Sequence, residues 1–547
     1  MQHSFTIEGR LVDIKGRTIY PAAVSIADGR ISQVLPLEDA PEQYLLPGFV
    51  DAHIHIESSM LVPSEFARIA VTHGTVATVS DPHEIANVCG IPGIDYMIGN
   101  AAGSPLKFSF GAPSCVPATP FETAGAVIDA TAIARLLQRK EIRYLAEMMN
   151  FPGVLHQDAE VMARIAAAHA AGKPVDGHAP GLRGAQAARY AAAGILTDHE
   201  CVSLDEALDK IAAGMYILIR EGSAARNYEA LAPLLRSHPG RVMFCSDDKH
   251  PDELVKGHIN RLVARAVSEG YDLFDVLHAA CVLPVQHYRL DVGQLQPGHP
   301  ADFIVVSDLK AFGVLQTYID GVLVAEQGRS LVRPVPIPRI NNCAAAQQPL
   351  QAFALPAPPD AGATIACRII EALDGQLLTG EATALLPVRE GLIRPDTGRD
   401  ILKIGVVNRY RDAPIALGFV RGFGLRQGAL ASSVAHDSHN IVFVGADDES
   451  ICRVVNAVLS HKGGIGLCSE GRTEVMPLPV AGLMTDKDAV TTAVQYESLD
   501  AGAKAMGSRL AAPFMTLSFM ALPVIPALKI SDKGLFDVAS FRFTNVF

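Results

Sequence analysis

The stretch "LPGFVDAHIHIESS", residues 46–59, places two histidines two positions apart at the end of an apolar run. In an extended strand, side chains at positions i and i+2 lie on the same face, so the rings of His53 and His55 point in the same direction. Two such imidazoles are either half of a metal site or a chance repeat. The stretch by itself leaves both interpretations open, and the rest of the chain has to decide between them.

The chain that follows this stretch alternates apolar strands with Ala-rich helical segments such as "AEVMARIAAAHAAG". This alternation is typical of parallel βα units. It predicts eight strands, at residues 45–51, 75–80, 106–111, 142–147, 174–176, 194–198, 215–220 and 241–245. Residues 46–292 make roughly 245 positions, close to the ~250 of a (β/α)8 TIM barrel. A doubly wound sheet is the alternative, but it predicts a glycine-rich phosphate loop after the first strand, where this chain has histidines.

The segments on both sides of the predicted barrel have a different pattern of apolar and turn-forming residues. Residues 1–45 and 293–335 show short alternating strands with Asp-Gly turns, and we predict that together they build one small β-sandwich domain. Seven prolines fall within 334–359, so we interpret 336–362 as a Pro/Ala-rich linker. Residues 363–547 mix strands and helices and are predicted to form an additional C-terminal α+β domain. The predicted fold class is therefore α/β.

The overall composition limits the classes of partner. The chain has 46 basic and 58 acidic residues, a net charge of −12, and no basic run, which argues against nucleic acid and anionic membrane surfaces as partners. No apolar run approaches the length of a membrane span, and we find no secretory signal. Nine scattered cysteines without a C-x-x-C motif argue against a disulfide framework. We expect a cytoplasmic protein that acts on a neutral or cationic small molecule.

Residues that suit metal binding follow the predicted strands. Active-site residues of a TIM barrel lie at the carboxyl ends of its strands. Four histidines and two carboxylates occupy five of these ends, enough for two divalent ions, and this mixture of donors suits Zn, Mn or Fe. The predicted ligands are His53, His55, Glu147, His178, His199 and Asp247. Asp248 is the alternative to Asp247.

This pattern resembles the amidohydrolase superfamily, which has H-x-H after strand 1, one histidine after each of strands 5 and 6, and an aspartate after strand 8. The motifs "DPHEIANV", "GHAPGL", "TDHE" and "ASSVAHDSHNIVFVG" resemble those of the bacterial adenine deaminases, and the resemblance covers nearly the whole chain. It implies that adenine is hydrolysed to hypoxanthine and ammonia when a hydroxide bridging two metal ions attacks C6. It also implies a homodimer or a larger homo-oligomer.

One position departs from the common superfamily pattern. Many members bridge their metals with a carbamylated lysine at the end of strand 4, where this chain has Glu147. The resemblance implies that the two oxygens of Glu147 span both cations. A buried glutamate paired with a basic residue is the alternative.

Further residues receive catalytic roles in this interpretation. Asp247 is expected to shuttle the proton to the leaving ammonia, and Glu84 or His83 is expected to protonate N1 of the purine. In the alternative for "DPHE", Asp81 and His83 only hold backbone groups of the loop. The cluster His436, Asp437 and His439 is either a surface turn or a hairpin that reaches the barrel mouth. There it would cover the purine or hold an extra ion.

Two other functions compete with deamination. A dihydroorotase-like or hydantoinase-like enzyme would open a cyclic amide, but its substrates usually carry a carboxylate and require a basic clamp, for which only Arg183 and Arg220 lie near strand ends. A metal-free structural homologue is the non-enzyme alternative. It should have lost ligands, whereas this chain retains each of them.

Overall fold

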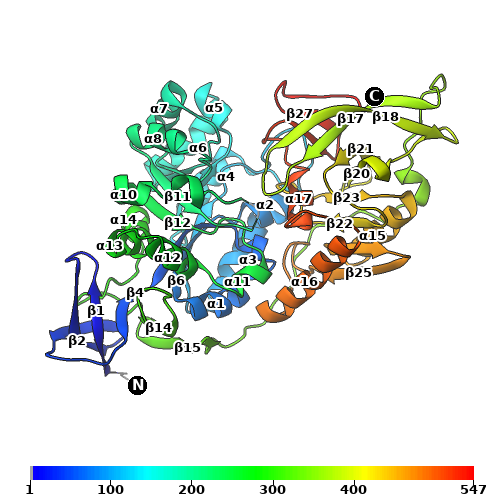
Figure 1. Cartoon of the computed structure of the whole chain (residues 1–547). Coiled ribbons are helices and arrows are strands. Elements are labelled where there is room, and N and C mark those ends of the chain that lie inside the picture. Colours follow the sequence, from blue (N-terminus) through cyan, green and yellow to red (C-terminus); the bar gives the residue numbers. More distant parts are fainter. Residues whose placement is uncertain (1–3, 224) are drawn as a thin grey trace.

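The computed structural model describes residues 4–223 and 225–547, and these form three lobes (Figure 1). A small sheet near the N-terminus lies at one end of the molecule, and a barrel of strands and helices occupies the middle. A large sheet with its helices forms the opposite end. The chain passes from the first lobe into the barrel, returns to the first lobe and then runs to the third.

Eight parallel strands form the barrel, as predicted. They group into sheets of five strands (β5-β6-β7-β8-β9) and three strands (β10-β11-β12). Isolated bridges from Ile54 to Asp247 and from Val175 to Ile195 close the ring between the two sheets. The strands are β5 (Phe49–Ile54), β6 (Thr75–Ser80), β7 (Lys107–Ala112), β8 (Ile142–Met148), β9 (Val175–Gly177), β10 (Thr197–Asp198), β11 (Tyr216–Arg220) and β12 (Val242–Cys245).

The first predicted strand differs from the observed one. Residues 45–51 were expected to form a single strand, but Gly48 separates β4 (Tyr44–Pro47) from β5. A Cβ atom at Gly48 would collide with the side chain of Val76, so only glycine lets the backbone pass this point. β4 is buried in the sheet of the small domain and β5 is buried in the barrel. Because both strands are buried, the apolar run continues across the boundary between the two sheets.

Helices connect the barrel strands and cover their outer faces. Several begin at side chains that accept hydrogen bonds from the first turn, such as Asp158 before α6, Ser203 before α8 and Asp272 before α13. The barrel helices are α1 (Pro63–Ala70), α2 (His83–Cys89), α3 (Ile91–Ala101), α4 (Ala130–Leu136), α5 (Phe151–Leu155), α6 (Ala159–Ala170), α7 (Gly184–Ala192), α8 (Leu204–Ala212), α9 (Tyr228–Leu231), α10 (Leu234–Ser237), α11 (Pro251–Leu254), α12 (Ile259–Ser268), α13 (Leu273–Leu277) and α14 (Leu283–Tyr288).

Both flanks of the barrel contribute to one small domain. Its eight strands lie in the order β16-β15-β14-β13-β4-β1-β2-β3, so hydrogen bonds join them into one continuous sheet where we expected the two sheets of a sandwich. Phe5 stacks on Tyr318, three strands away in this order, with 5.4 Å between ring centroids. This contact shows that the sheet bends around its own core. The remaining strands are β1 (Phe5–Asp13), β2 (Thr18–Ala27), β3 (Arg30–Pro36), β13 (Phe303–Val306), β14 (Val314–Ile319), β15 (Val322–Glu326) and β16 (Arg329–Ser330).

The proline-rich segment contains neither helix nor strand over residues 331–349, and one short 3-10 turn (Leu350–Phe353) follows. The third lobe is built on a nine-stranded sheet with the order β19-β18-β17-β21-β20-β23-β22-β24-β25, and a small sheet β26-β27-β28 lies beside it. Its strands are β17 (Thr364–Ala372), β18 (Thr379–Arg389), β19 (Leu392–Ile393), β20 (Ile401–Val407), β21 (Ala416–Arg421), β22 (Ala429–Ser432), β23 (Ile441–Gly445), β24 (Gly464–Ser469), β25 (Arg472–Pro477), β26 (Leu528–Ser531), β27 (Gly534–Asp537) and β28 (Arg542–Phe543). Its helices are α15 (Asp448–Ser460), α16 (Ala489–Ala505) and α17 (Pro513–Phe519).

This C-terminal domain packs on the loops that follow the barrel strands. The backbone N–H of Thr485 donates to the carbonyl of Met60, after β5. The N–H of Thr123, after β7, donates to the carboxylate of Asp532 at 2.8 Å. The domain therefore covers the carboxyl end of the barrel, where TIM barrels carry their active sites. Among the helices of the described residues, none is both long and apolar enough to cross a membrane.

The close packing of the barrel at Gly177 gives a stability prediction. A Cβ atom there would collide with the carbonyl oxygen of Thr197, which is backbone and cannot move aside. We expect Gly177→Ala to lower the free energy of unfolding by about 2–3 kcal/mol, measured by denaturant titration. Gly99→Ala is the matched control, because nothing lies within 4 Å of its added methyl group. Its position in helix α3 predicts a gain of ~0.5–1 kcal/mol. Equal stability of the two variants would contradict this packing.

Candidate metal centre

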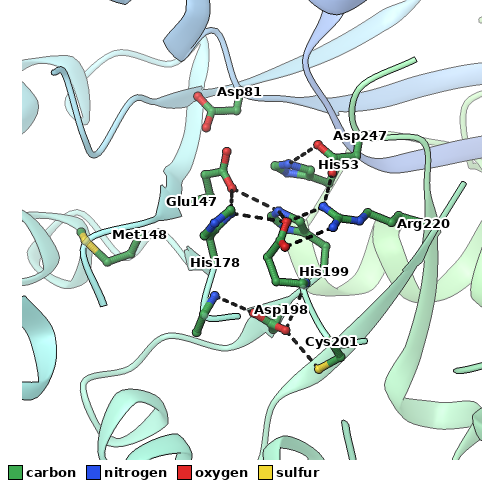
Figure 2. Close-up of polar contacts among 12 residues, drawn as sticks. His53, Asp81, Glu147, Met148, His178, Asp198, His199, Cys201, Arg220 and Asp247 are labelled. Carbon is green, nitrogen blue, oxygen red and sulfur yellow. Dashed lines mark hydrogen bonds and ion pairs between the residues drawn. The ribbon is translucent and has the colours of Figure 1, made fainter. Parts of the chain in front are cut away.

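Glu147, near the end of β8, lies at the centre of a buried cluster of imidazoles (Figure 2). Its Oε1 atom is 3.2 Å from Nε2 of His55. Its Oε2 atom is 2.8 Å from Nδ1 of His178 and 3.1 Å from Nε2 of His199. The two carboxylate oxygens therefore face different histidines, as a carboxylate that bridges two cations must.

Asp247 follows β12 and faces the same cluster. Its Oδ1 atom lies 3.6 Å from Nε2 of His53 and 3.3 Å from Nε2 of His55. Its Oδ2 atom accepts a hydrogen bond of 2.5 Å from Arg220 (Figure 2). The φ angle of Asp247 is 55°, a left-handed conformation that is uncommon for residues other than glycine and is frequent at functional sites. The structure thus brings all six predicted ligands together in one buried group.

The neighbouring Asp248 lies in the same cavity but is bound differently. Its Oδ1 atom accepts a hydrogen bond of 2.5 Å from the hydroxyl of Ser58. Between the two aspartates, Asp247 is the one in contact with both His53 and His55.

The electrostatic environment keeps the central carboxylates ionised. Burial raises the pKa of Glu147, but the neighbouring His178, His199 and His55 outweigh burial and hold this pKa well below its usual range. Burial acts in the same direction on Asp247, and the guanidinium of Arg220 is the main group that outweighs it and lowers the pKa. The centre therefore presents anionic oxygens and imidazole nitrogens together.

This donor set fits divalent cations. Groups of three of these side chains place potential ligand atoms within 4.8 Å of one another, including His53 with His199 and Asp247, and Glu147 with His178 and His199. Nδ1 of His53 is buried without a hydrogen-bond partner in the structure. Nitrogen and carboxylate donors without sulfur suit Zn, Mn or Fe.

Two buried residues that the sequence analysis did not place at the centre support it. Arg220, at the end of β11, hydrogen-bonds both Glu200 and Asp247, so its charge offsets two buried carboxylates. Glu200 also lies 3.6 Å from Nδ1 of His178. The sequence contained a signal for both residues, because Glu200 directly follows the predicted ligand His199 in "TDHE" and Arg220 is the last residue of a predicted strand.

The loop after β6 brings the other predicted catalytic residues to the same site. Nδ1 of His83 is 3.0 Å from the carboxylate of Asp81, and Nε2 is 3.5 Å from Oε1 of Glu84. Burial lowers the pKa of His83, but Asp81 and Glu84 outweigh burial and raise it well above its usual range. Asp81 thus holds the ring as well as the loop backbone, since it also accepts from the N–H of His83 at 3.0 Å.

The hairpin turn between β22 and β23 also reaches this site. Nδ1 of His436 lies 2.5 Å from Oε1 of Glu84, and Nε2 of His439 hydrogen-bonds the other oxygen of Glu84. His436, Asp437 and His439 are all buried, so the surface-turn alternative is wrong. Burial raises the pKa of Glu84, but the two histidines outweigh burial and hold it well below its usual range.

A cavity lies between the metal cluster and the C-terminal domain. Its barrel side carries the candidate ligands. The side formed by the C-terminal domain combines His436 and Asp437 with the apolar residues Leu377, Phe519, Leu522 and Ile525. Lys529 ties two of these segments together by donating to the carbonyls of Leu377 at 2.8 Å and Phe519 at 3.0 Å. The cavity volume is about 30 Å³, whereas small-molecule sites usually exceed ~300 Å³. The cavity in this structure is therefore smaller than a site that encloses a small molecule.

Comparisons with known proteins divide the chain at the same place as the fold. Residues 44–324 match the model of the amidohydrolase family, and residues 376–542 match that of the adenine deaminase C-terminal domain. An adenine deaminase of Salinibacter ruber is 55% identical over 100% of both chains. Adenine deaminases of Sulfurovum sp. and Methanosarcina barkeri are 52% and 50% identical, over 98% and 99% of this chain and 99% of each relative.

The position of Glu147 gives a prediction about metal content. Glu147→Gln keeps the shape of the side chain but removes the negative charge between the imidazoles. We expect the metal bound per chain to fall by at least half relative to the wild type, measured by elemental analysis after dialysis, with an unchanged circular dichroism spectrum. Glu474→Gln makes the same chemical change on an exposed strand and should retain the full metal content. A Glu147→Gln protein with wild-type metal content would contradict the bridging role.

Proposed function

Because the chain belongs to the amidohydrolase family, and within it to the adenine deaminases, we propose that it hydrolyses adenine to hypoxanthine and ammonia at this centre. The observation that carries the proposal is that residues from both matched regions line a single cavity. The barrel region supplies the candidate metal ligands, and the C-terminal region supplies the apolar cover. Such a cover suits the flat, largely apolar faces of a purine.

The proposal includes two divalent cations per chain, with Mn, Fe or Zn as the candidates. His53, His55 and Asp247 would hold one cation and His178 and His199 the other, and Glu147 would lie between them. The support is that the two oxygens of Glu147 face different histidines. When bound, divalent cations in such a site supply a water molecule that is activated at neutral pH.

Asp247 is the residue we assign to proton transfer between this water and the leaving amine. Arg220 holds Oδ2 of Asp247, while Oδ1 faces the imidazoles of the centre. This fixed orientation supports a role for one oxygen of Asp247 in taking up the proton. The same carboxyl group then delivers the proton to the exocyclic nitrogen, so that ammonia leaves as a neutral molecule.

His83 is the residue we assign to protonation of N1 of the purine. Both oxygens of Glu84 accept hydrogen bonds from the C-terminal histidines, so Glu84 has no proton to offer. Asp81 holds Nδ1 of His83 and leaves Nε2 directed toward Glu84 and the cavity. Between the two candidates of the "DPHE" loop, the hydrogen bonding favours His83 as the donor and Glu84 as the group that orients it.

The ring-opening alternative has weaker support. Its substrates require a free basic clamp, but Arg220 is the only arginine among the described residues lining the cavity, and Glu200 and Asp247 both engage it. Arg183 is half exposed and pairs with Asp209 at 2.5 Å. The structural-homologue alternative also loses support, since all six ligands are present and clustered.

The remaining parts of the proposal concern the setting of the enzyme. We keep a homodimer or a larger homo-oligomer in the cytoplasm as the expected form. The net charge of −12 supports a small-molecule substrate rather than nucleic acid or an anionic membrane surface.

Substrate preference tests the proposed activity directly. The metal-loaded protein is expected to release ammonia from adenine, with a kcat/KM at least ~10-fold above that for adenosine, because the covered cavity has to accommodate a ribose in the second case. A coupled ammonia assay with both substrates, and with chelator-treated protein as the control, measures this. Faster turnover of adenosine would refute the assignment.

Substitution of Asp247 separates proton transfer from metal binding. In Asp247→Asn the other five ligands remain, so we expect most of the metal to stay bound. We expect kcat to fall about 100-fold or more, because an amide cannot accept the proton, while KM changes little. Steady-state kinetics and metal analysis of the same preparation are the measurements. A change in KM alone would instead assign Asp247 to substrate positioning.

A further inference from the structure

Two candidate ligands of the metal centre meet where the first and last strands of the barrel close the ring. The backbone N–H of Asp247, after β12, donates to the carbonyl of His53, in β5, at 2.9 Å. An isolated bridge joins Ile54 to Asp247 at the same place. The relative position of His53 and Asp247 therefore depends on how these two strand ends are held together.

The buried carboxylate of Asp51 joins the two strand ends. Its Oδ1 atom accepts hydrogen bonds from the backbone N–H groups of His53 at 3.3 Å and Ser246 at 3.1 Å. Its Oδ2 atom accepts from the hydroxyl of Ser246. His53 is itself a candidate ligand, and Ser246 directly precedes the candidate ligand Asp247. One carboxylate thus holds the backbone at both strand ends.

A histidine from the outer layer of helices holds Asp51 in turn. Nε2 of His258, the residue before α12, is 2.8 Å from Oδ2 of Asp51. A carboxylate can only accept, so Nε2 donates this hydrogen bond. Nδ1 of the same ring lies 2.7 Å from the hydroxyl of Thr75, the first residue of β6. The side chains of Asp51 and His258 are fully buried, and these contacts leave the carboxylate one orientation.

Asp51 and His258 do not reach the cavity beside the candidate ligands. Asp51 therefore acts on the centre only through the residues that it holds. Arg220 differs in this respect, because it contacts the side chain of Asp247 itself. Polar residues behind the ligands set the geometry of metal sites, and their loss typically costs roughly 10- to 100-fold in metal affinity or activity.

We propose that Asp51, held by His258, is a positioning residue that sets the separation of His53 and Asp247 and thereby the metal affinity of the centre. This inference rests on the proposed function, in which His53 and Asp247 hold the same cation. A shift of one strand end against the other changes the distance between two ligands of one ion. Because distances between ligands and metals vary by only ~0.2 Å, a small displacement is enough to weaken binding.

The test compares removal of the carboxylate with a variant that keeps its shape. Asp51→Ala loses all four hydrogen bonds of the side chain. We expect its dissociation constant for Mn²⁺, measured by competition with a chelator, to rise about 10- to 100-fold. Asp51→Asn should stay within ~5-fold of the wild type. Its oxygen still accepts from both backbone N–H groups, and its amide nitrogen can donate to the Ser246 hydroxyl and the His258 ring, which can accept as well as donate.

Asp302 provides a matched control for the loss of a buried aspartate. It lies in the small domain and also accepts from two backbone N–H groups, those of Gly293 at 2.8 Å and Asp320 at 2.9 Å. Asp302→Ala should lower the free energy of unfolding without changing the affinity for Mn²⁺. Unchanged affinity in Asp51→Ala, or an equal rise of the dissociation constant in Asp302→Ala, would overturn the proposal. So would an Asp51→Asn protein that binds as weakly as Asp51→Ala, since charge rather than position would then be the property that matters.

His258→Ala is the second variant, for use where Asp51→Ala does not fold. It removes only the contact that orients Asp51, and we expect the dissociation constant for Mn²⁺ to rise at least ~3-fold. An unchanged value would equally overturn the proposal. Because Mn²⁺ binding is measured without substrate, the result is independent of deamination. A wild-type protein that binds Mn²⁺ but releases no ammonia from adenine counts against the proposed function alone.

Discussion

The carboxylate of Glu147, buried among imidazoles from three barrel strands, is the interaction on which the site depends. A charged carboxylate at this depth is costly unless opposite charge or hydrogen-bond donors surround it. His55, His178 and His199 provide these contacts in the structure, and each of them comes from a different strand end. A closed barrel is what brings ends that are far apart in the chain to one point. The site therefore exists only when the ring of strands closes.

Charge balance extends outward from this centre. Arg220 hydrogen-bonds both Asp247 and Glu200. Lys210, in helix α8, hydrogen-bonds Asp198, the residue that precedes His199. Each buried cation is held between carboxylates, so removal of one partner leaves an unpaired charge in the interior. The contact with Arg220 also holds the side chain of Asp247 in one orientation, and outer residues set the geometry of metal sites in this way.

The C-terminal domain completes the cavity. Glu84 belongs to the barrel, but both of its oxygens are held by His436 and His439 from the other domain. The same contact joins the two domains and orients the loop that carries His83. The apolar side chains that cover the cavity also come from this domain, held in place by Lys529. Neither of the two matched regions forms this cavity by itself.

Local pattern determined much of this protein from the sequence alone. Strand positions followed from apolar runs bounded by turns, and the i, i+2 spacing of His53 and His55 placed both rings on one face, because these periodicities are properties of neighbouring residues. The rule that barrel sites lie at strand ends then selected all six of the candidate ligands that the structure brings together. The chain gave no local sign that Gly48 divides one apolar run between two sheets, or that both flanks share a single sheet, because burial looks alike in either sheet. Only the tertiary structure decided the contact between Glu84 and His436, which lie 352 positions apart, and the engagement of Arg220 by two carboxylates. The first contact depends on how the two domains pack and the second on how the barrel closes, and no spacing along the chain encodes either of them.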